Sequence, residues 1–141
     1  MSTLRILHDA QAIEAHKALR AHVTAANRAR GLQFSDRPLA VFRWDDVTNT
    51  MIAGACGLVC PGWLNLELLW VEVPHRGQGI AAALLEDIED EAVQLGAHSA
   101  YLWTQEFEAP GFYYKYGYRE FAQLDEFMRG HQLIGMKKKL V

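Results

Sequence analysis

The sequence predicts an α/β fold with a mixed, mostly antiparallel sheet, and three observations support this prediction. Short apolar, strand-like runs recur along the chain. Several of them follow one another with only a turn between, as antiparallel strands do. A clear helical repeat separates two of the later runs. The 141 residues suffice for one core, so we expect a single domain over residues 1–141. It should hold about six to seven strands and about three to four helices.

The composition is typical of a soluble globular protein. Half of the residues are hydrophobic, and 14 basic against 17 acidic residues give a net charge of -3. This balance argues against a protein that grips the backbone of a nucleic acid. No apolar run reaches membrane-spanning length, and the first residues lack the apolar core of a signal peptide. We therefore expect a cytoplasmic protein with no nucleic-acid or membrane partner.

The first part of the chain predicts a strand, a helix and a hairpin. Residues 3–8 alternate as a short strand, and Asp9 is the expected N-cap of the helix that follows. A loop, or helices joined by a loop, is expected over residues 31–38. Strands over residues 39–44 and 51–60 with a hairpin connection follow. The second of these strands is apolar on both faces, which favours a central place in the sheet.

Cys56 and Cys60 lie four residues apart in this second strand. Neighbours at this spacing on one strand do not easily close a disulfide. No further cysteine or close histidine completes a metal-ligand pattern. We therefore expect two free thiols and no metal site.

The third strand, expected over residues 64–73, changes the phase of its alternation part-way along. Its apolar residues stand at even positions up to Leu68 and at odd positions from Leu69 onward. A slip of one residue would turn every later side chain to the wrong face, and a β-bulge absorbs such a slip. The pattern therefore predicts a bulge near residues 68–71.

The second half of the chain begins with a helix over residues 80–95. Its apolar residues follow helical spacing, and Gly96 is placed to end it. The acidic residues between positions 86 and 91, and the lysines at 137–139, are expected on solvated surfaces. A strand, a short helix starting near Pro110 and a closing antiparallel pair then complete the fold. These strands are expected over residues 98–104, 118–124 and 131–140.

The turn over residues 75–81 joins the third strand to this helix and reads His-Arg-Gly-Gln-Gly-Ile-Ala. A helix N-terminus exposes unpaired N–H groups, and glycine lets the backbone approach a phosphate closely. Arg76 adds a side-chain donor for an anion. No Gly-Lys-Ser/Thr follows and the third glycine is absent, so the turn is neither a P-loop nor a dinucleotide fingerprint. It predicts a diphosphate held mainly by main-chain groups.

A bulge near Leu69 would separate the third strand from the strand over residues 98–104. The main-chain N–H and C=O groups left without partners could pair with an extended, amide-containing ligand, as a further strand would. A ligand with a diphosphate at one end and two amides along an arm is coenzyme A.

Two motifs carry a resemblance to a known family. Residues 76–81 fit the pattern Arg/Gln-x-x-Gly-x-Gly/Ala, and residues 112–118 fit the pattern Phe-Tyr-x-x-x-Gly-Tyr/Phe. Both are signatures of the GNAT superfamily of N-acetyltransferases, which the chain resembles well from Leu64 to its end. Residues 1–60 match only in the order of strands and helices. The proline often found three residues before the arginine is Val73 here, with Pro74 one position later.

The resemblance implies an enzyme that transfers an acetyl group from its co-substrate acetyl-CoA to a primary amine of a small molecule or peptide, by direct attack. A main-chain N–H near residues 69–71 would polarise the thioester carbonyl. The residues expected to bind the cofactor are Leu69, Trp70, Val71, Val73, Arg76, Gly77, Gln78, Gly79, Ile80 and Ala81.

Tyr113 matches the family's tyrosine, whose hydroxyl lies near the sulfur of CoA and protonates the leaving thiolate. Tyr114 and Tyr116 compete with it and are more typical of packing residues. Glu67, just before the expected bulge, is the expected base or amine-positioning group. Its alternatives are Glu72, Glu106 and Glu108, and a chain of waters replaces a direct base in many family members. His131 and His75 are further candidates for contacts to the acceptor and to the phosphates.

Two other functions stay open at this point. One is a non-catalytic acyl-CoA-binding or sensing domain, and the other is a transferase for a longer acyl-CoA. The acceptor also stays open among aminoglycosides, polyamines, amino acids and protein N-termini. Because family members often form dimers, a homodimer is a further open expectation.

Overall fold

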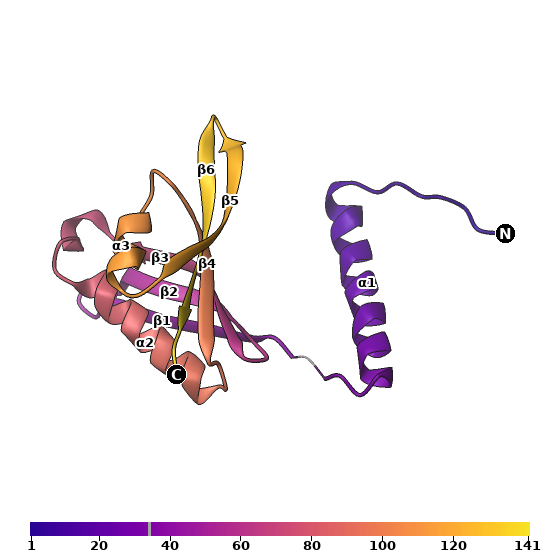
Figure 1. Cartoon of the computed structure of the whole chain (residues 1–141), viewed down its shortest axis with the longest axis horizontal. Coiled ribbons are helices and arrows are strands. Elements are labelled where there is room, and N and C mark those ends of the chain that lie inside the picture. Colours follow the sequence, from indigo (N-terminus) through magenta and orange to yellow (C-terminus); the bar gives the residue numbers. More distant parts are fainter. Residues whose placement is uncertain (34) are drawn as a thin grey trace. The chain divides into compact units, whose positions relative to one another are not determined.

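The structure is a computed structural model that describes residues 1–33 and 35–141 (Figure 1). Contacts divide the chain into two compact units, Met1–Ser35 and Asp36–Val141, and each is described by itself. Phe34, which belongs to the loop expected over residues 31–38, lies outside the described residues.

The first unit contains the helix α1 (Asp9–Ala29). The strand expected over residues 3–8 is wrong, because residues 1–8 are in neither a helix nor a strand. Alternating polarity describes a face, but a strand also needs a hydrogen-bonded neighbour, and no described strand pairs with this segment. The N-cap of α1 is His8, and Asp9 is instead the first helical residue, with a φ of 51°.

In the described part of the second unit, six strands form one sheet in the order β1-β2-β3-β4-β6-β5 (Figure 1). Their bounds are β1 (Arg37–Asp45), β2 (Thr50–Cys60), β3 (Trp63–Val71), β4 (Ser99–Gln105), β5 (Arg119–Met128) and β6 (His131–Lys139). The β3–β4 pair is parallel and the other neighbouring pairs are antiparallel. The mixed, mostly antiparallel sheet is therefore confirmed, and β2 lies inside it as its apolar faces predict.

Two helices flank this sheet, α2 (Ile80–Gln94) and α3 (Pro110–Lys115), and a 3₁₀ turn, η1 (Val73–His75), follows β3. The apolar stripe of α2 is buried at Leu84, Ile88 and Ala92, as the helical spacing predicts. Its end is also as predicted, because Gly96 adopts a left-handed φ of 97° directly after the C-cap.

Glu89 departs from the solvated face expected for the acidic residues of α2. It is buried, and its carboxylate accepts hydrogen bonds from Lys138 Nζ at 2.8 and 3.0 Å and from the Tyr118 hydroxyl at 3.0 Å. Lys138 is correspondingly only partly exposed, although it was expected on a solvated strand end. A charge can be buried at this position because it is paired and hydrogen-bonded.

The β-bulge in β3 lies at Glu67, one residue before the expected range of 68–71. Leu66 pairs with Gly57 and Leu68 pairs with Cys56, so that Glu67 is the extra residue of β3. The alternation changes phase across it, from buried Leu66 to buried Val71, as the sequence pattern predicts. A Cβ at Gly57 would collide with a main-chain carbonyl of β3, so the residue opposite the bulge has to be glycine.

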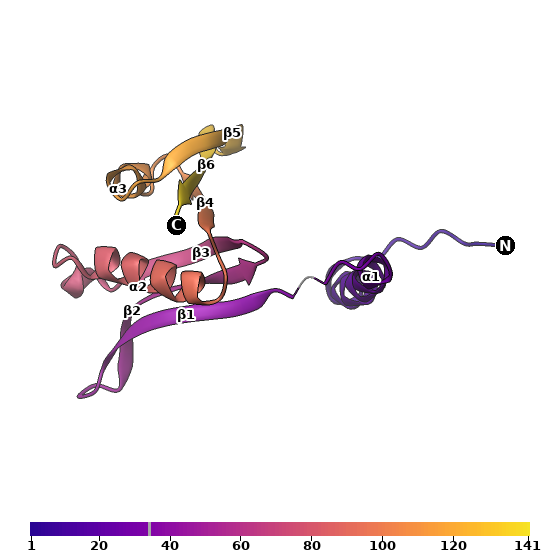
Figure 2. The same cartoon turned by 60° about the horizontal axis from the view of Figure 1, so that its bottom comes forward.

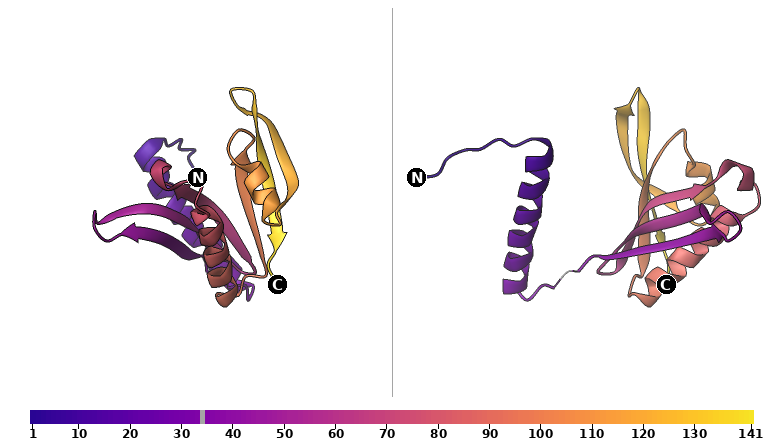
Figure 3. Two further views of the ribbon diagram at one scale, coloured as in Figure 1. Left: turned by 90° about the vertical axis from the view of Figure 1, so that its left-hand side faces the viewer. Right: turned by 180° about the vertical axis from the view of Figure 1, so that it is seen from behind.

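Beyond the bulge, β3 and β4 separate. Their pairing runs from Trp63–Ser99 to Leu66–Leu102. After this point β3 continues along β2, while β4 continues along β6. The two halves of the sheet diverge there (Figures 2 and 3). Among the described residues, the facing edges of both strands therefore have no strand partner beyond Leu66 and Leu102.

Candidate functional site

A cavity of about 640 Å³ occupies this opening and extends to the start of α2. The residues expected to bind the cofactor that line it are Leu69, Trp70, Val71, Arg76, Gly77, Gly79, Ile80 and Ala81. The expected catalytic Tyr113 lines the same cavity. Val73, Gln78 and Glu67 are not part of its lining. The fold thus brings the glycine turn and the tyrosine motif to one place, although 34 positions separate Gly79 from Tyr113.

The glycine turn leaves the start of α2 open. Gly77 and Gly79 have left-handed φ angles of 78° and 80°, which side chains other than glycine rarely adopt. A Cβ at either position would meet nothing within 4 Å, so the space in front of the turn is free. Gly79 is the N-cap of α2, and the N–H groups of the first helical turn have no partners within the helix. This end of the cavity can therefore hold an anion.

Arg76 connects the turn to the end of β3. Its Nε donates a hydrogen bond to the Val71 carbonyl oxygen at 2.8 Å. The bond fixes the turn against the strand and leaves the terminal guanidinium nitrogens as the donors that could reach an anion. Arg76 therefore also anchors the turn to β3, a structural role that the sequence did not predict.

Tyr113 is well suited to stay neutral. It lies on α3, is 9% exposed and contacts the rings of Phe112 and Tyr118 edge to face, at 5.2 and 5.7 Å between centroids. Burial, with a further contribution from the Glu108 carboxylate, raises the pKa of Tyr113 to about 12. Its hydroxyl therefore keeps its proton at neutral pH. Tyr114 is exposed and donates to Glu120 at 3.3 Å, away from the cavity lining.

Glu67 lies at the bulge, just beyond the last β3–β4 pair, Leu66–Leu102. Its side chain is exposed at the bulge, where the alternation of buried and exposed residues along β3 changes phase. Its exposed carboxylate is therefore open to a charged molecule that reaches the end of the β3–β4 ladder.

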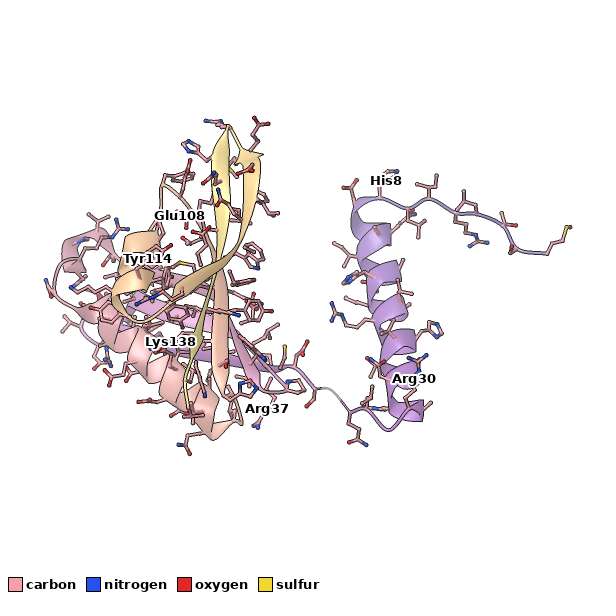
Figure 4. The ribbon with its side chains drawn as sticks, viewed as in Figure 1. His8, Arg30, Arg37, Glu108, Tyr114 and Lys138 are labelled. Atoms are coloured by element: carbon pink, nitrogen blue, oxygen red, sulfur yellow. The ribbon has the colours of Figure 1, made fainter. Side chains whose placement is uncertain are left out.

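Two polar residues of the cavity were not among the expected binding residues. Thr104 is 4% exposed on β4, and Glu108 lies in the connection between β4 and α3 (Figure 4). Glu108 was considered only as an alternative base. A signal for Thr104 exists in the sequence, because it is a polar residue at an inward position of an otherwise apolar strand.

The remaining alternatives for the base lie in side-chain pairs. Glu72 Oε2 is 3.5 Å from His75 Nε2, and His75 lines the cavity. Glu106 Oε1 is 2.9 Å from His131 Nδ1, at the ends of β4 and β6. All four residues were candidates from the sequence, but the sequence did not indicate that they would contact each other in these pairs.

A second cavity, of about 700 Å³, lies beside α2 and the end of β6. Its lining includes Glu89 and Lys138, which satisfy each other, and lacks the glycine turn and Tyr113. Over residues 1–33 and 35–141, no cluster of three or more His, Cys, Asp or Glu side chains could hold a metal ion. None of the described helices is both long and apolar enough to span a membrane.

A sequence profile described as an acetyltransferase (GNAT) domain matches residues 8–140. The chain belongs to the GNAT family of acetyltransferases. This GNAT protein is 35% identical over 135 residues to an acetyltransferase of Agrobacterium fabrum, covering 95% of this chain and 97% of the relative. It is also 35% identical over 81 residues to blasticidin-S acetyltransferase of Streptomyces morookaense, covering 57% and 60% of the two chains.

Solved structures agree with this assignment. A crystal structure of an Agrobacterium tumefaciens acetyltransferase superposes with a TM-score of 0.83 at 33% identity, over 99% of this GNAT chain and 98% of that one. An aminoglycoside 6′-N-acetyltransferase complexed with coenzyme A shares the fold, with a TM-score of 0.65 at 22% identity over 74% and 73% of the two chains. The GNAT protein is thus an acetyltransferase of the acetyl-CoA-dependent type.

Proposed function

We propose that this GNAT enzyme transfers the acetyl group of acetyl-CoA to a primary amine of a small molecule or peptide, by direct attack of the amine on the thioester. One observation carries the proposal: a single cavity contains both the glycine turn at the start of α2 and the buried hydroxyl-bearing ring of Tyr113. An anion-binding turn and a proton donor that line one cavity match a cofactor with a diphosphate at one end and a thioester at the other.

The cofactor would lie along the freed edge of β3. The diphosphate binds the first N–H groups of α2, at Ile80 and Ala81, where glycine allows a close approach. The amides of the arm pair with the main chain of residues 69–71, which β4 no longer covers. Val73 and Gln78 would contribute from the outer side of the turn.

The chemistry would divide between the two faces of the sheet. A main-chain N–H beside the bulge polarises the thioester carbonyl as the tetrahedral oxyanion develops. Tyr113 donates its proton to the departing thiolate. Glu67, on the opposite face, holds the incoming amine through charge and hydrogen bonding, which fits its exposure at the edge of the opening.

The names of the relatives suggest which acceptors to try first. One relative is named for blasticidin S, and the CoA-bound structure is of an enzyme named for aminoglycosides. A panel of blasticidin S, kanamycin, spermidine, L-lysine and a peptide with a free N-terminus covers small polar amines and peptide amines.

The experiment has two stages. Calorimetric titration with CoA should show binding, and acetyl-CoA with the panel should release free thiol together with an N-acetylated product by mass spectrometry. Absence of CoA binding would contradict the proposal. Binding without thiol release for any amine would favour an acyl-CoA-binding or sensing domain. Faster release from hexanoyl-CoA than from acetyl-CoA would favour a longer acyl donor.

The proposal covers the whole chain as one acetyltransferase domain, which the profile match over residues 8–140 supports. We further propose a cytoplasmic location, from the sequence pattern, and a homodimer, from the family resemblance. Fractionation of cells and light scattering of the purified chain test these two points separately from activity.

A further inference from the structure

Glu106 and His131 form a hydrogen-bonded pair at the end of the sheet where β3 and β4 have separated. Glu106 Oε1 lies 2.9 Å from His131 Nδ1, although 25 positions separate the two residues. The Glu106 N–H donates to the Gln132 carbonyl oxygen at 3.0 Å, which extends the β4–β6 ladder past its last pair, Gln105–Leu133. The main-chain ladder therefore holds this carboxylate beside this imidazole.

The hydrogen bond and an aromatic contact orient the ring of His131. An ionised carboxylate can only accept a hydrogen bond, so Nδ1 carries the hydrogen and Nε2 of the neutral imidazole keeps its lone pair. The Phe107 ring packs against the imidazole with centroids 4.7 Å apart and planes at 66°. The ring is thus held on two sides, with Nε2 as its proton-accepting nitrogen.

Glu106 is close along the chain to the lining of the proposed acetyl-CoA cavity, although neither Glu106 nor His131 is part of that lining. The Glu108 N–H donates to the Gln105 carbonyl oxygen at 2.9 Å and closes a turn that contains Glu106. Glu108, at the end of this turn, lines the cavity together with Tyr113. Glu108 is two positions after Glu106, so the Cα atoms of the two residues are at most about 7 Å apart.

Alternation along β6 favours the face of the sheet opposite α2 for His131. Lys138, on the same strand, reaches Glu89 of α2 with its Nζ. Seven positions separate Lys138 from His131, and alternation along a strand puts residues at odd separations on opposite faces. Glu67 lies at the bulge where β3 and β4 separate, so an amine held there would be close to a thioester presented from the cavity.

We propose that His131 Nε2 accepts the proton that the acceptor amine loses as it attacks the thioester, and that Glu106 positions the imidazole for this step. The N–C bond forms and the C–S bond breaks. The amine proton passes to Nε2, directly or through one water, and the thiolate takes the proton of Tyr113. The imidazolium then returns a proton to the tyrosinate through solvent, so the enzyme ends unchanged. This inference rests on the proposed function.

The charged groups around the pair come from three segments. Glu108 belongs to the β4–α3 connection, Asp125 of β5 accepts a hydrogen bond from Gln132 at 3.0 Å, and Arg129 lies in the turn before His131. The test therefore uses uncharged substitutions of similar shape at constant ionic strength, so that these neighbouring charges are the same in every variant.

The test compares His131→Gln and Glu106→Gln in the full chain, with acetyl-CoA and the five amines of the panel as probes. His131→Gln is expected to lower kcat about 10²-fold and to flatten the pH dependence of kcat/KM, because an amide cannot accept the proton of the amine. Glu106→Gln is expected to lower kcat about 10- to 100-fold. CoA affinity and melting temperature should stay at their wild-type values in both variants.

Two matched controls accompany these variants. His98→Gln removes another hydrogen-bonded histidine, at the opposite end of β4, and Glu120→Gln removes another carboxylate that accepts a side-chain hydrogen bond. Both should keep the wild-type pH profile. A wild-type profile in His131→Gln would overturn the inference alone, since turnover and CoA binding would still support the proposed function. Failure of the wild-type enzyme to acetylate any of the five amines would overturn both.

Discussion

Lys138 Nζ lies 2.8 and 3.0 Å from the two carboxylate oxygens of Glu89, and this ion pair joins β6 to α2. The Glu89 side chain is 9% exposed, whereas that of Lys138 is 26% exposed. The carboxylate therefore depends on its partners more than the ammonium does. Removing a partner from such a pair leaves an uncompensated buried charge.

Lys138→Met is accordingly expected to destabilise the fold by about 3 kcal/mol. The long apolar side chain keeps the packing and removes only the charge. Urea unfolding measures the effect. Lys137→Met is the matched control, because its ammonium lies over the Phe121 ring, away from Glu89, and should leave the midpoint nearly unchanged. Equal urea midpoints for the two variants would mean that the Glu89–Lys138 pair contributes little to the stability of the fold.

Tyr113→Phe is expected to lower kcat by about 10²-fold with no change in CoA affinity, because the variant keeps the ring and loses only the proton donor. Tyr114→Phe, which removes the neighbouring exposed hydroxyl, should stay within about twofold of wild type. Thiol release and calorimetry with CoA separate the two quantities. Wild-type turnover in Tyr113→Phe would remove this residue from its proposed role.

Gly79→Glu is expected to abolish CoA binding, because the new carboxylate would occupy and repel the diphosphate position at the start of α2. The left-handed backbone also strains any side chain here, so the strain needs its own control. Gly96→Glu supplies it, since Gly96 has a comparable φ of 97° and open space at the other end of α2. Calorimetry should show binding in Gly96→Glu and none in Gly79→Glu.

Glu67→Gln should raise KM for a cationic acceptor about tenfold and leave KM for acetyl-CoA unchanged, since the residue lies at the bulge and outside the cavity lining. The effect should shrink at high salt because exposed charges are screened. Steady-state kinetics at low and high ionic strength provide the measurement. A change in KM for acetyl-CoA alone would place Glu67 on the cofactor side instead.

The stability of the fold is expected to fall at alkaline pH. The pKa of Tyr113 is raised to about 12, above the value near 10 of an unfolded tyrosine, so the folded state favours the neutral phenol. This contribution is complete below about pH 10 and is lost as the pH rises toward 12, because the unfolded chain releases its proton first. Burial and Glu89 raise the pKa of Tyr118 in the same direction. Urea midpoints between pH 8 and 11.5 should decline, and Tyr113→Phe should flatten the decline.

The sequence located the elements of the second unit because its local patterns are strong. The phase change in β3 revealed a bulge near residues 68–71, and the structure puts the extra residue at Glu67, directly before this range. The alternation of apolar residues shows that the phase changes, but it does not show which residue is the extra one. Glu67 and Leu68 are both exposed, so burial does not distinguish them either. The position was fixed by the partner strand, where Gly57 leaves room that no other residue would.

Contacts between distant segments could not be predicted in the same way. Glu89 stands within a run of acidic residues, and nothing local shows that Lys138 and Tyr118 will cover it. Glu106 and His131 were both noticed, but their pairing depends on the β4–β6 register. The strand expected over residues 3–8 failed for the opposite reason, because a clear local pattern had no described partner strand.

The separation of β3 from β4 also has a consequence for the amount of enzyme in a cell. Among the described residues, four pairs of the β3–β4 ladder join the two halves of the sheet. A cofactor lying between the halves adds hydrogen bonds along this short seam, and binding to the folded state alone adds stability that grows with ligand concentration. The lifetime of the protein should therefore follow the supply of acetyl-CoA. Proteolysis rates measured with and without CoA would check this, and starved cells should turn the enzyme over faster than well-fed ones.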